Sequence, residues 1–296
     1  MSDLVHSPTV MQWLLRGIAR MPLPKLQGFY ANLAPVLDDS AREFTVQFEG
    51  LNYNGTLSQY VDRHIFYFGA YSPVELSFLK QAAKLLRANR EMLTFVDVGA
   101  NVGQHSLFMS RYADKVVAFE PNSEVADRLA RNVALNDIRN INLIRCALGS
   151  EERVGRLGSG LNKNSGSRSL VWSLDVDRDI VVPVVCGDIA LTELEIERVD
   201  ILKVDVEGYE KNVFWGMHKT LARDRPIILF ELVGDDVKGG FGTEAELRES
   251  LYCDAELFTL RGKFSPQLVP FDWSGEEAVC LPRELLEGFV RLQRKT

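Results

Sequence analysis

The residues of this chain that could do chemistry are acids at the ends of apolar, strand-like runs, and the first run leads into a glycine-bracketed turn. The run Phe95–Val98 contains Asp97, and Gly99 and Gly103 follow at the spacing D-x-G-x-x-x-G. Glycine is needed where a backbone bends sharply and approaches a ligand closely. The spacing differs from the G-x-G-x-x-G of nicotinamide binders. Because Asp97 would repel a pyrophosphate but attract an ammonium or sulfonium, the turn favours S-adenosylmethionine as ligand.

A second acid ends the next strand-like run, Lys115–Glu120. In doubly wound sheets, an acid about 20 residues beyond the glycine turn accepts hydrogen bonds from ribose hydroxyls. Glu120 lies 17 residues after Gly103, which predicts this role for it. An ordinary strand-ending turn would also produce Glu-Pro, but the nearby glycine turn favours cofactor binding.

Further acids follow two later strand-like runs. Asp205 and Glu207 come after Val199–Val204, and Glu231 ends Pro226–Glu231. Ligands of open α/β sheets bind outside the carboxyl ends of the strands. We therefore expect these acids to gather with the two earlier ones in a polar site for a ribose, a cation and a hydroxyl-bearing acceptor.

A lysine precedes one of these acids within a core strand. Lys203 lies two residues before Asp205, so both side chains point to the same face of the strand. A lysine in such a position needs a partner of opposite charge, which Asp205 or Glu231 could supply. Lys203 therefore either takes part in catalysis or forms a structural ion pair, and both interpretations stay open.

Strand-like and helix-like segments alternate from Phe95 onward, which predicts an α/β fold with a mostly parallel sheet. The segment Ser72–Glu75 has the spacing of a capping box and predicts a helix that runs to about Arg90. The polar stretch 151–180 interrupts the alternation as a long loop, a kind of segment that is usually functional or disordered. The expected strands cover residues 95–98, 115–120, 141–145, 181–186, 199–204 and 226–231, with antiparallel strands at 257–260 and 278–281.

Residues 1–70 are predicted to form an accessory segment, and residues 71–296 a cofactor-binding domain that carries the polar insertion. In the accessory segment, strands at 44–48 and 52–57 are expected to pair as a hairpin. Val10–Ile18 has the pattern of an amphipathic helix, which would lie on a membrane surface or pack on the domain or a partner. Packing is the favoured interpretation.

Composition argues against several classes of protein. The 296-residue chain is 46% hydrophobic and 25% charged, as expected for a globular protein with a large core. Its net charge of −7 argues against nucleic acid binding, which needs clustered Lys and Arg. Four scattered cysteines without a C-x-x-C pair indicate neither a zinc site nor a disulfide framework. No apolar stretch is long enough for a transmembrane segment, and no secretory leader is recognisable, so a cytoplasmic location is expected.

Five motifs occur in a distinctive order in this chain: Gly69–Glu75, Phe95–Gly103, Phe119–Pro121, Cys146–Gly149 and Leu202–Glu210. Over roughly residues 65–281 the chain resembles the FkbM family of S-adenosylmethionine-dependent methyltransferases. The resemblance implies a doubly wound, Rossmann-like class I methyltransferase fold with a mostly parallel sheet of seven strands. It also implies transfer of a methyl group to a hydroxyl of a sugar, polysaccharide or polyketide.

The resemblance further implies roles for individual residues. Those implied for cofactor binding are Asp97 at the methionine amino group, Gly99, Ala100, Asn101 and Gly103 around the methionine, Glu120, Pro121 and Asn122 at the ribose, and Cys146 and Ala147 at the adenine. Asp205 and Glu207, with Lys203 beside them, would be the catalytic residues. Gln104 and His105 depart from the aromatic residues common at these positions in relatives.

An acceptor hydroxyl is a poor nucleophile, and a positioned base contributes about 10²–10⁴-fold to its reaction. Asp205 is the first candidate for this base and Glu207 the second, while His64 and His105 are less favoured. In a variant mechanism, Asp205 and Glu231 would hold a divalent cation, because hard cations prefer oxygen ligands. The sequence offers no dedicated group of metal ligands, so a metal-free site is expected.

Other functions are less well supported. A non-catalytic scaffold with the same fold would not need the strand-end acids, and the glycine spacing argues against a dehydrogenase. The N-P-P-[YF] loop of base-methylating enzymes is absent. The acceptor would be recognised by the segments 1–70, 151–180 and 234–242. An aromatic set would either line the acceptor site or, as is slightly favoured, pack in the core: Phe66, Tyr67, Phe68, Tyr71 and Trp172.

Overall fold

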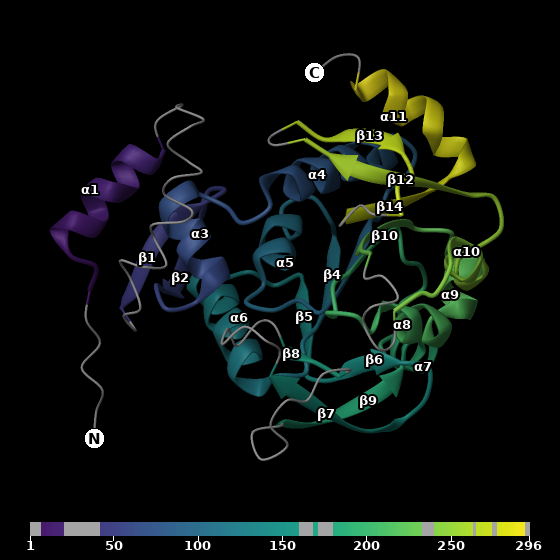
Figure 1. Ribbon diagram of the computed structural model, residues 1–296, viewed down its shortest axis with the longest axis horizontal. Helices are drawn as coiled ribbons and strands as arrows, with labels where there is room; N and C mark the ends of the chain where they lie inside the picture. The colour runs from purple at the N-terminus through teal and green to yellow at the C-terminus, as the bar shows by residue number, and fades with distance from the viewer. Residues whose placement is uncertain are drawn as a thin grey trace.

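An eight-stranded sheet with helices on both faces forms the centre of the computed structural model, which describes residues 7–20, 42–159, 168–170, 180–232, 240–262, 265–273 and 277–293 (Figure 1). The strand order is β13-β12-β14-β11-β10-β3-β4-β5. These strands are β3 (Thr94–Val98), β4 (Lys115–Phe119), β5 (Ile141–Ile144), β10 (Ile201–Val204), β11 (Ile227–Glu231), β12 (Ala255–Arg261), β13 (Gln267–Pro270) and β14 (Glu277–Pro282).

Five of these strands are parallel and form the doubly wound part of the sheet. Along the sheet they run β5, β4, β3, β10, β11, and each neighbouring pair is parallel. Numbered in chain order this is 3-2-1-4-5, which places the topological switch point between β3 and β10. The α/β fold with a mostly parallel sheet is therefore as predicted, although the sheet is mixed.

The sheet has eight strands and not the seven predicted. The C-terminal region adds three antiparallel strands to the five parallel ones. β14 pairs with β11, β12 with β14, and β13 with β12. The last of these was not predicted from the sequence. It is a short edge strand that ends at Pro270, and such strands carry a weak hydrophobic signal.

The helices are those expected between parallel strands, with additional ones at the N-terminus and C-terminus. Their bounds are α1 (Val10–Ala19), α3 (Tyr60–Phe68), α4 (Pro73–Arg87), α5 (Gln104–Met109), α6 (Ser123–Leu135), α7 (Gly187–Glu193), α8 (Glu210–Gly216), α9 (His218–Asp224), α10 (Glu244–Ser250), the 3-10 helix η2 (Arg283–Leu285) and α11 (Leu286–Gln293). Pro73 begins α4 as predicted, but the capping box does not form. Ser72 has a left-handed backbone with φ of 35° and no side-chain cap bond, and Glu75 approaches His105 instead.

Each face of the central sheet buries its own apolar cluster, because successive side chains of a strand point to opposite sides. On β3, Phe95 belongs to one cluster, whereas Val96 and Val98 belong to the other. The first cluster includes side chains of α4, α5 and α11, and the second includes side chains of α8, α9 and α10. This two-sided burial fixes where the strand ends lie, and thereby the position of the residues that follow them.

A second sheet occupies much of the described part of the predicted polar loop. It consists of β6 (Ala147–Gly149), β7 (Arg153–Ser159), β8 (Arg168–Ser169) and β9 (Ile180–Cys186) in the order β6-β9-β7-β8. The prediction of a loop is therefore wrong for β7 and β8. Glycines such as Gly155 gave this stretch the composition of a loop. In the structure, Gly155 lies within β7, where a Cβ would be only 2.7 Å from side-chain atoms of Leu170 and Val184.

The accessory segment contains the predicted hairpin, β1 (Glu43–Phe48) and β2 (Leu51–Thr56), which packs on α6. Two asparagines of α6 bind the backbone of β2 as a neighbouring strand would. Asn132 accepts from Asn54 N at 2.7 Å and donates to Asn54 O at 3.0 Å, and Asn136 makes the corresponding bonds to Asn52. These bonds satisfy an otherwise open strand edge.

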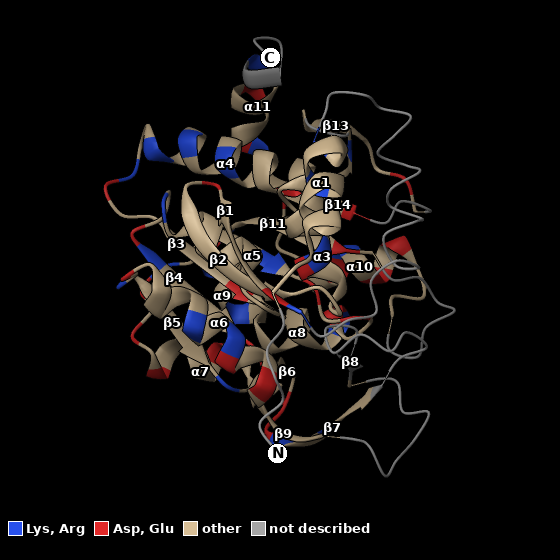
Figure 2. Ribbon diagram, turned by 90° about the vertical axis from the view of Figure 1, so that its left-hand side faces the viewer, with Lys and Arg blue, Asp and Glu red and all other residues tan. Residues whose placement is uncertain are grey.

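The helix α1 lies at the left edge of the molecule in Figure 1, outside α3, and this side faces the viewer in Figure 2. It packs on α3, as the favoured interpretation predicted: Arg16 Nε donates to Phe66 O at 2.8 Å, and Trp13 makes an edge contact with the Phe66 ring. Val10 and Met11 remain largely exposed. No helix within the described residues is long and apolar enough to cross a membrane.

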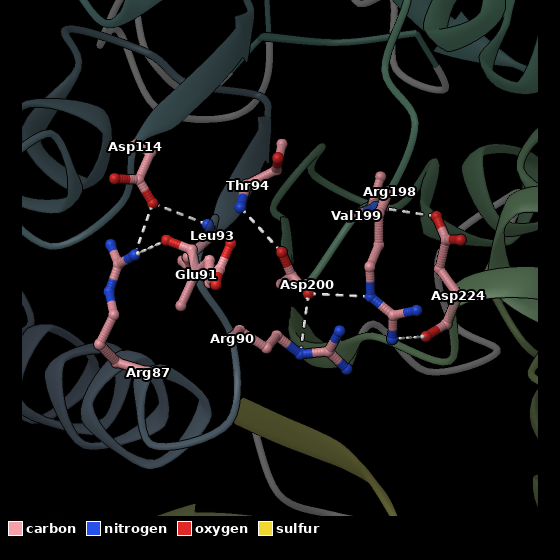
Figure 3. A network of polar contacts seen from close by, with 10 residues as sticks. All are labelled: Arg87, Arg90, Glu91, Leu93, Thr94, Asp114, Arg198, Val199, Asp200 and Asp224. Atoms are coloured by element: carbon pink, nitrogen blue, oxygen red, sulfur yellow. Dashed lines mark hydrogen bonds and ion pairs between the residues drawn. The ribbon is translucent and has the colours of Figure 1, made fainter.

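At the amino ends of the strands, buried aspartates bind the backbone where strands begin (Figure 3). Asp200 Oδ2 accepts from Thr94 N at 2.9 Å, while its Oδ1 pairs with Arg90 and Arg198. Asp224 Oδ2 accepts from Val199 N at 2.8 Å. Because β3 and β10 are both held in this way, the network supports the strands whose other ends carry the site.

Candidate functional site

The glycine turn after β3 lies directly against the end of β10. Gly99 and Gly103 have positive φ values of 82° and 86°. A Cβ on Gly99 would lie 1.9 Å from the carbonyl oxygen of Asp205, so no side chain fits at this position. The amides of Gly99 and Ala100 both donate to Phe119 O at 3.0 Å. The turn is thus fixed between β10 and β4, at the topological switch point.

Glu120 connects the turn to the residues that follow β4. Its two carboxyl oxygens accept from Asn101 N at 2.9 Å and from Asn122 N at 2.8 Å. A carboxylate has about four acceptor positions, so two remain for ligand hydroxyls. Burial raises the pKa of Glu120 to about 7, and the charges of Asp97 and Asp205 add to this effect, whereas the two amides oppose it.

Asp97 is fully buried beneath the turn. Its Oδ2 accepts from Ser106 Oγ at 2.6 Å, whereas its Oδ1 has no hydrogen-bond partner among the described residues. Buried polar atoms are rarely left without a partner. A carboxylate oxygen of this kind suits a positively charged donor such as an amino group, so the residues around the turn fit S-adenosylmethionine.

An open cavity with an empty volume of about 1280 Å³ lies at the carboxyl ends of the parallel strands. Nine of the residues predicted for the site line it: Gly99, Asn101, Glu120, Pro121, Asn122, Cys146, Ala147, Asp205 and Glu207. The other four, Asp97, Ala100, Gly103 and Lys203, are buried beside it or pack behind it. Cys146 lies at the bend between β5 and β6 rather than within a strand.

Lys203 forms an ion pair with Asp205. Its Nζ lies 2.8 Å from Asp205 Oδ2, and the lysine side chain is 3% exposed whereas that of the aspartate is 38% exposed. Burial alone would lower the pKa of Lys203, but the charges of Asp205, Glu75 and Asp97 raise it above its usual value. The lysine therefore stays charged and holds Asp205 at the cavity wall. A catalytic part for Lys203 stays a prediction.

Three further acids make this part of the cavity strongly acidic. Burial raises the pKa of Glu207 to about 7 and that of Glu231 to about 9, and the charge of Asp205 contributes to both shifts. Glu277 lies opposite Glu231 in the antiparallel register of β14 and β11, and burial raises its pKa well above the usual value. Glu277 was not predicted from the sequence. The sequence signal that could have indicated it is its position, directly before the apolar run 278–281 that was predicted as the last antiparallel strand.

The aromatic set divides between core and cavity. Phe66 and Tyr67 are buried in the core, which agrees with the slightly favoured interpretation that the aromatic set packs there. Trp172 lies outside the described residues. Tyr71 lines the cavity together with Tyr60, which was not predicted. The two rings meet at right angles with centroids 5.7 Å apart, and the His64 ring lies 4.3 Å from Tyr60 and 5.6 Å from Tyr71. We call Tyr60 and Tyr71 the tyrosine wall.

His105 does not line the cavity but contacts a residue that does. Its Nε2 lies 3.1 Å from Glu75 Oε2, an ion-pair distance, although the ring nitrogen is not aligned for a hydrogen bond. Burial would raise the pKa of Glu75, but His105 and the charge of Lys203 lower it to about 2. Among the described residues, no group of three or more His, Cys, Asp or Glu side chains could hold a metal ion.

The fold and this site define a Rossmann-like α/β protein in which a glycine turn and an acid-lined cavity meet at the topological switch point. The domain model described as "Methyltransferase FkbM domain" matches residues 97–253, which is more than half of the chain. The chain therefore belongs to the FkbM family of S-adenosylmethionine-dependent methyltransferases.

Individual relatives are moderately similar. The chain is 29% identical over 154 residues to the hexuronic acid methyltransferase AglP of Haloferax volcanii, covering 48% of this chain and 57% of that protein. It is 30% identical over 178 residues to methyltransferase sdnD of Sordaria araneosa, covering 47% and 67%. The chain thus matches only part of each relative's length. The crystal structure of a methyltransferase FkbM from Methylobacillus flagellatus aligns with a TM-score of 0.42 and 16% identity, covering 64% of this chain and 43% of that one.

Proposed function

We propose that the protein transfers a methyl group from S-adenosylmethionine to a hydroxyl of a sugar, polysaccharide or polyketide-type acceptor. The observation that carries this proposal is the meeting of the glycine turn with Asp205 and Glu207 at one cavity. S-adenosylmethionine supplies an electrophilic methyl group when it is bound, so the protein mainly aligns the acceptor and excludes water.

In this proposal, the residues of the turn and of β4 hold the cofactor. Asp97 offers its unsatisfied buried oxygen to the amino group, and Glu120 offers its remaining acceptor positions to the ribose hydroxyls. Asn122 Nδ2 is a buried donor without a hydrogen-bond partner among the described residues, and it lies beside Glu120 in the cavity lining. Cys146 and Ala147 lie at the edge where the adenine is expected.

Glu207 is the better base and Asp205 the group that orients the acceptor hydroxyl. A general base works best when its pKa lies near the operating pH, and that of Glu207 is about 7. Asp205 forms an ion pair with the ammonium of Lys203 at 2.8 Å, which holds its carboxyl at the cavity wall. Glu207 accepts the proton that the hydroxyl loses, while Asp205 receives a hydrogen bond from the acceptor. This reverses the order of the two candidates given by the sequence.

The charges of the cavity favour a neutral acceptor over an anionic one. Seven acids line it, and Arg128 is the single Lys or Arg side chain among the described lining residues. Arg128 is already paired with Asp62. The acids are Asp62, Glu75, Glu120, Asp205, Glu207, Glu231 and Glu277. The relative from Haloferax volcanii is named for a hexuronic acid, but a carboxylate in this cavity would be desolvated beside Asp205 and would add a negative charge to a group of acids that already hold protons because of their burial.

The proposal is tested by methyl transfer from labelled S-adenosylmethionine to a panel of neutral glycans, polyketides, uronic acids and amines, followed by mass spectrometry. We expect a methyl ether on a neutral hydroxylated compound and little transfer to uronic acids. Loss of transfer in Asp205→Asn with retained binding of S-adenosylhomocysteine would place the defect in chemistry. Methylation of an amine or a carboxylate in place of a hydroxyl would contradict the proposal.

A further inference from the structure

We propose that Gln104 is a positioning residue that transmits cofactor binding to the tyrosine wall of the acceptor site. The inference rests on the proposed function, because it takes the cavity beside the tyrosine wall to be where the acceptor binds. Gln104 begins α5, immediately after Gly103 of the cofactor turn, and is 3% exposed.

The Gln104 side chain holds the backbone of Tyr71 at both of its polar groups. Tyr71 N donates to Gln104 Oε1 at 2.7 Å, and Gln104 Nε2 donates to Tyr71 O at 3.2 Å. A reciprocal pair of this kind fixes both the position and the orientation of the residue that it binds. The two residues are far apart in the chain, so local structure does not enforce the contact.

Residue 71 belongs to a short connection that has little regular structure of its own. It joins the end of α3 at Phe68 to the start of α4 at Pro73. Gly69 and Ser72 on either side of it have left-handed backbones, with φ of 96° and 35°. No helix or strand ladder holds the backbone of Tyr71, so the two bonds to the Gln104 side chain fix its backbone while Tyr60 and His64 contact its ring.

Tyr71 faces the residues proposed to act on the acceptor. Its ring lines the cavity and contacts Tyr60. Asp205 and Glu75 line the same cavity, and burial together with their negative charges raises the pKa of the Tyr71 hydroxyl. A tyrosine in this place can stack on a sugar ring and orient one of its hydroxyls.

His105, the second residue of α5, also contacts a residue that lines the cavity. His105 lies 3.1 Å from Glu75 in the first turn of α4, and Glu75 also lines the cavity. The first two residues of α5 therefore each contact one residue of the acceptor side. A cofactor that orders the turn from Gly99 to Gly103 would stiffen the start of α5 and, through Gln104, the connection that carries Tyr71.

The experiment is hydrogen–deuterium exchange of the full chain with and without S-adenosylhomocysteine. In the wild type, we expect slower exchange on binding both in the turn 99–108 and in the connection 69–76. In Gln104→Ala, the protection of 99–108 should persist, with affinity for S-adenosylhomocysteine within about threefold of the wild type, while the protection of 69–76 is lost. If Gln104 only supported the fold, Gln104→Ala would change the exchange of 69–76 by the same amount with and without ligand.

Two further variants make the test specific. Gln104→Glu keeps the oxygen that accepts from Tyr71 N and, once its carboxyl is ionised, lacks the donor to Tyr71 O, so at a pH where this carboxyl is ionised it should fold and lose part of the protection. Ser110→Ala removes a bond from Ser110 Oγ to Leu107 O at the other end of α5 and should behave as the wild type. Retained ligand-dependent protection of 69–76 in both Gln104 variants, or its absence in the wild type, would overturn the inference. Failure of the wild type to bind S-adenosylhomocysteine would overturn the proposed function as well.

Discussion

At the scale of single residues, the carboxyl groups of this protein differ in what surrounds them at the two ends of the sheet. Asp200 is paired with two arginines and accepts a backbone amide at the amino end of the strands. Glu207 and Glu231, at the carboxyl end, are buried among other acids. Burial and the neighbouring acids raise the pKa of both carboxyls by more than the charge of Lys203 lowers it. The first arrangement stabilises the fold, whereas the second is suited to proton transfer.

The binding role of Glu120 is tested by Glu120→Gln. The amide replaces one acceptor oxygen by a donor, which then faces a backbone N–H, and it removes the charge that favours a ribose hydroxyl. Hydrogen bonds to charged groups contribute about 1.5–3 kcal/mol, so we expect S-adenosylhomocysteine affinity to fall about 10–100-fold. Titration calorimetry measures this. Unchanged affinity in the folded variant would remove Glu120 from the cofactor site.

The role of Glu207 as base is tested by the pH dependence of turnover. The carboxyl must be ionised to accept a proton, and its pKa is about 7, so wild-type kcat should rise as pH increases through about 7 and then level off. Glu207→Gln should lower kcat by about 10²–10⁴-fold and abolish this rise. A variant that keeps the rise would show that another group titrates.

The residues that could be predicted from the sequence are those that a strand and its following turn bring together. Asp97 lies near the end of an apolar run, and Glu120 and Asp205 directly follow one, so their position at the same edge of the sheet could be inferred. Tyr60 and Glu277 could not be assigned to the site in this way. Tyr60 reaches the cavity from α3 of the accessory segment, and Glu277 does so only because β14 runs antiparallel to β11.

At the scale of elements, the site depends on the close approach of the glycine turn to β10. Gly99→Ala should both destabilise the protein and abolish cofactor binding, because the new Cβ would overlap the Asp205 carbonyl at 1.9 Å. The left-handed backbone alone costs a non-glycine residue about 1–3 kcal/mol. Urea unfolding and calorimetry with S-adenosylhomocysteine measure the two effects.

Gly17→Ala is the matched control for this substitution. Gly17 lies within α1, and a Cβ there meets no atom within 4 Å. Alanine in a helix interior is favoured over glycine by about 0.5–1 kcal/mol, so this variant should be unchanged or slightly more stable. If Gly99→Ala were as harmless as Gly17→Ala, the turn would not lie against β10 as described.

Prediction of the elements succeeded where hydrophobic pattern and tertiary structure agree. Four of the parallel strands, β3, β4, β10 and β11, are mostly apolar runs buried on both faces, and the apolar residues of the partly exposed edge strand β5 made it recognisable as well. The strands β7 and β8 were not recognised, because glycines and polar residues interrupt the alternation of apolar and polar residues. At Gly155 of β7, neighbouring side chains occupy the space that a side chain would fill. The capping box did not form because Ser72 has a left-handed backbone, whereas an N-cap residue usually has an extended one.

At the scale of the whole molecule, the gathering of buried acids should make stability depend on pH. Burial raises the pKa of Glu120, Glu207 and Glu210 to about 7 and that of Glu231 to about 9. A carboxyl whose pKa is higher in the folded state than in the unfolded state binds its proton more tightly when folded. Below about pH 4.5 the carboxyl is protonated in both states and ionisation costs no stability, and this ionisation cost grows as pH rises toward the folded pKa.

Glu231→Gln isolates the largest of these effects. The amide cannot ionise, so the variant should match the wild type in thermal stability near pH 4.5 and exceed it increasingly up to about pH 9. Each kcal/mol corresponds to roughly 2–4 °C in a chain of this size, and we expect at least that difference at pH 8.5. Thermal denaturation followed by circular dichroism at pH 4.5, 7 and 8.5 measures it, with Glu249→Gln on the exposed side of α10 as control. An advantage of Glu231→Gln that is independent of pH would mean that the substitution improves packing, and that Glu231 does not hold a proton in the native cavity.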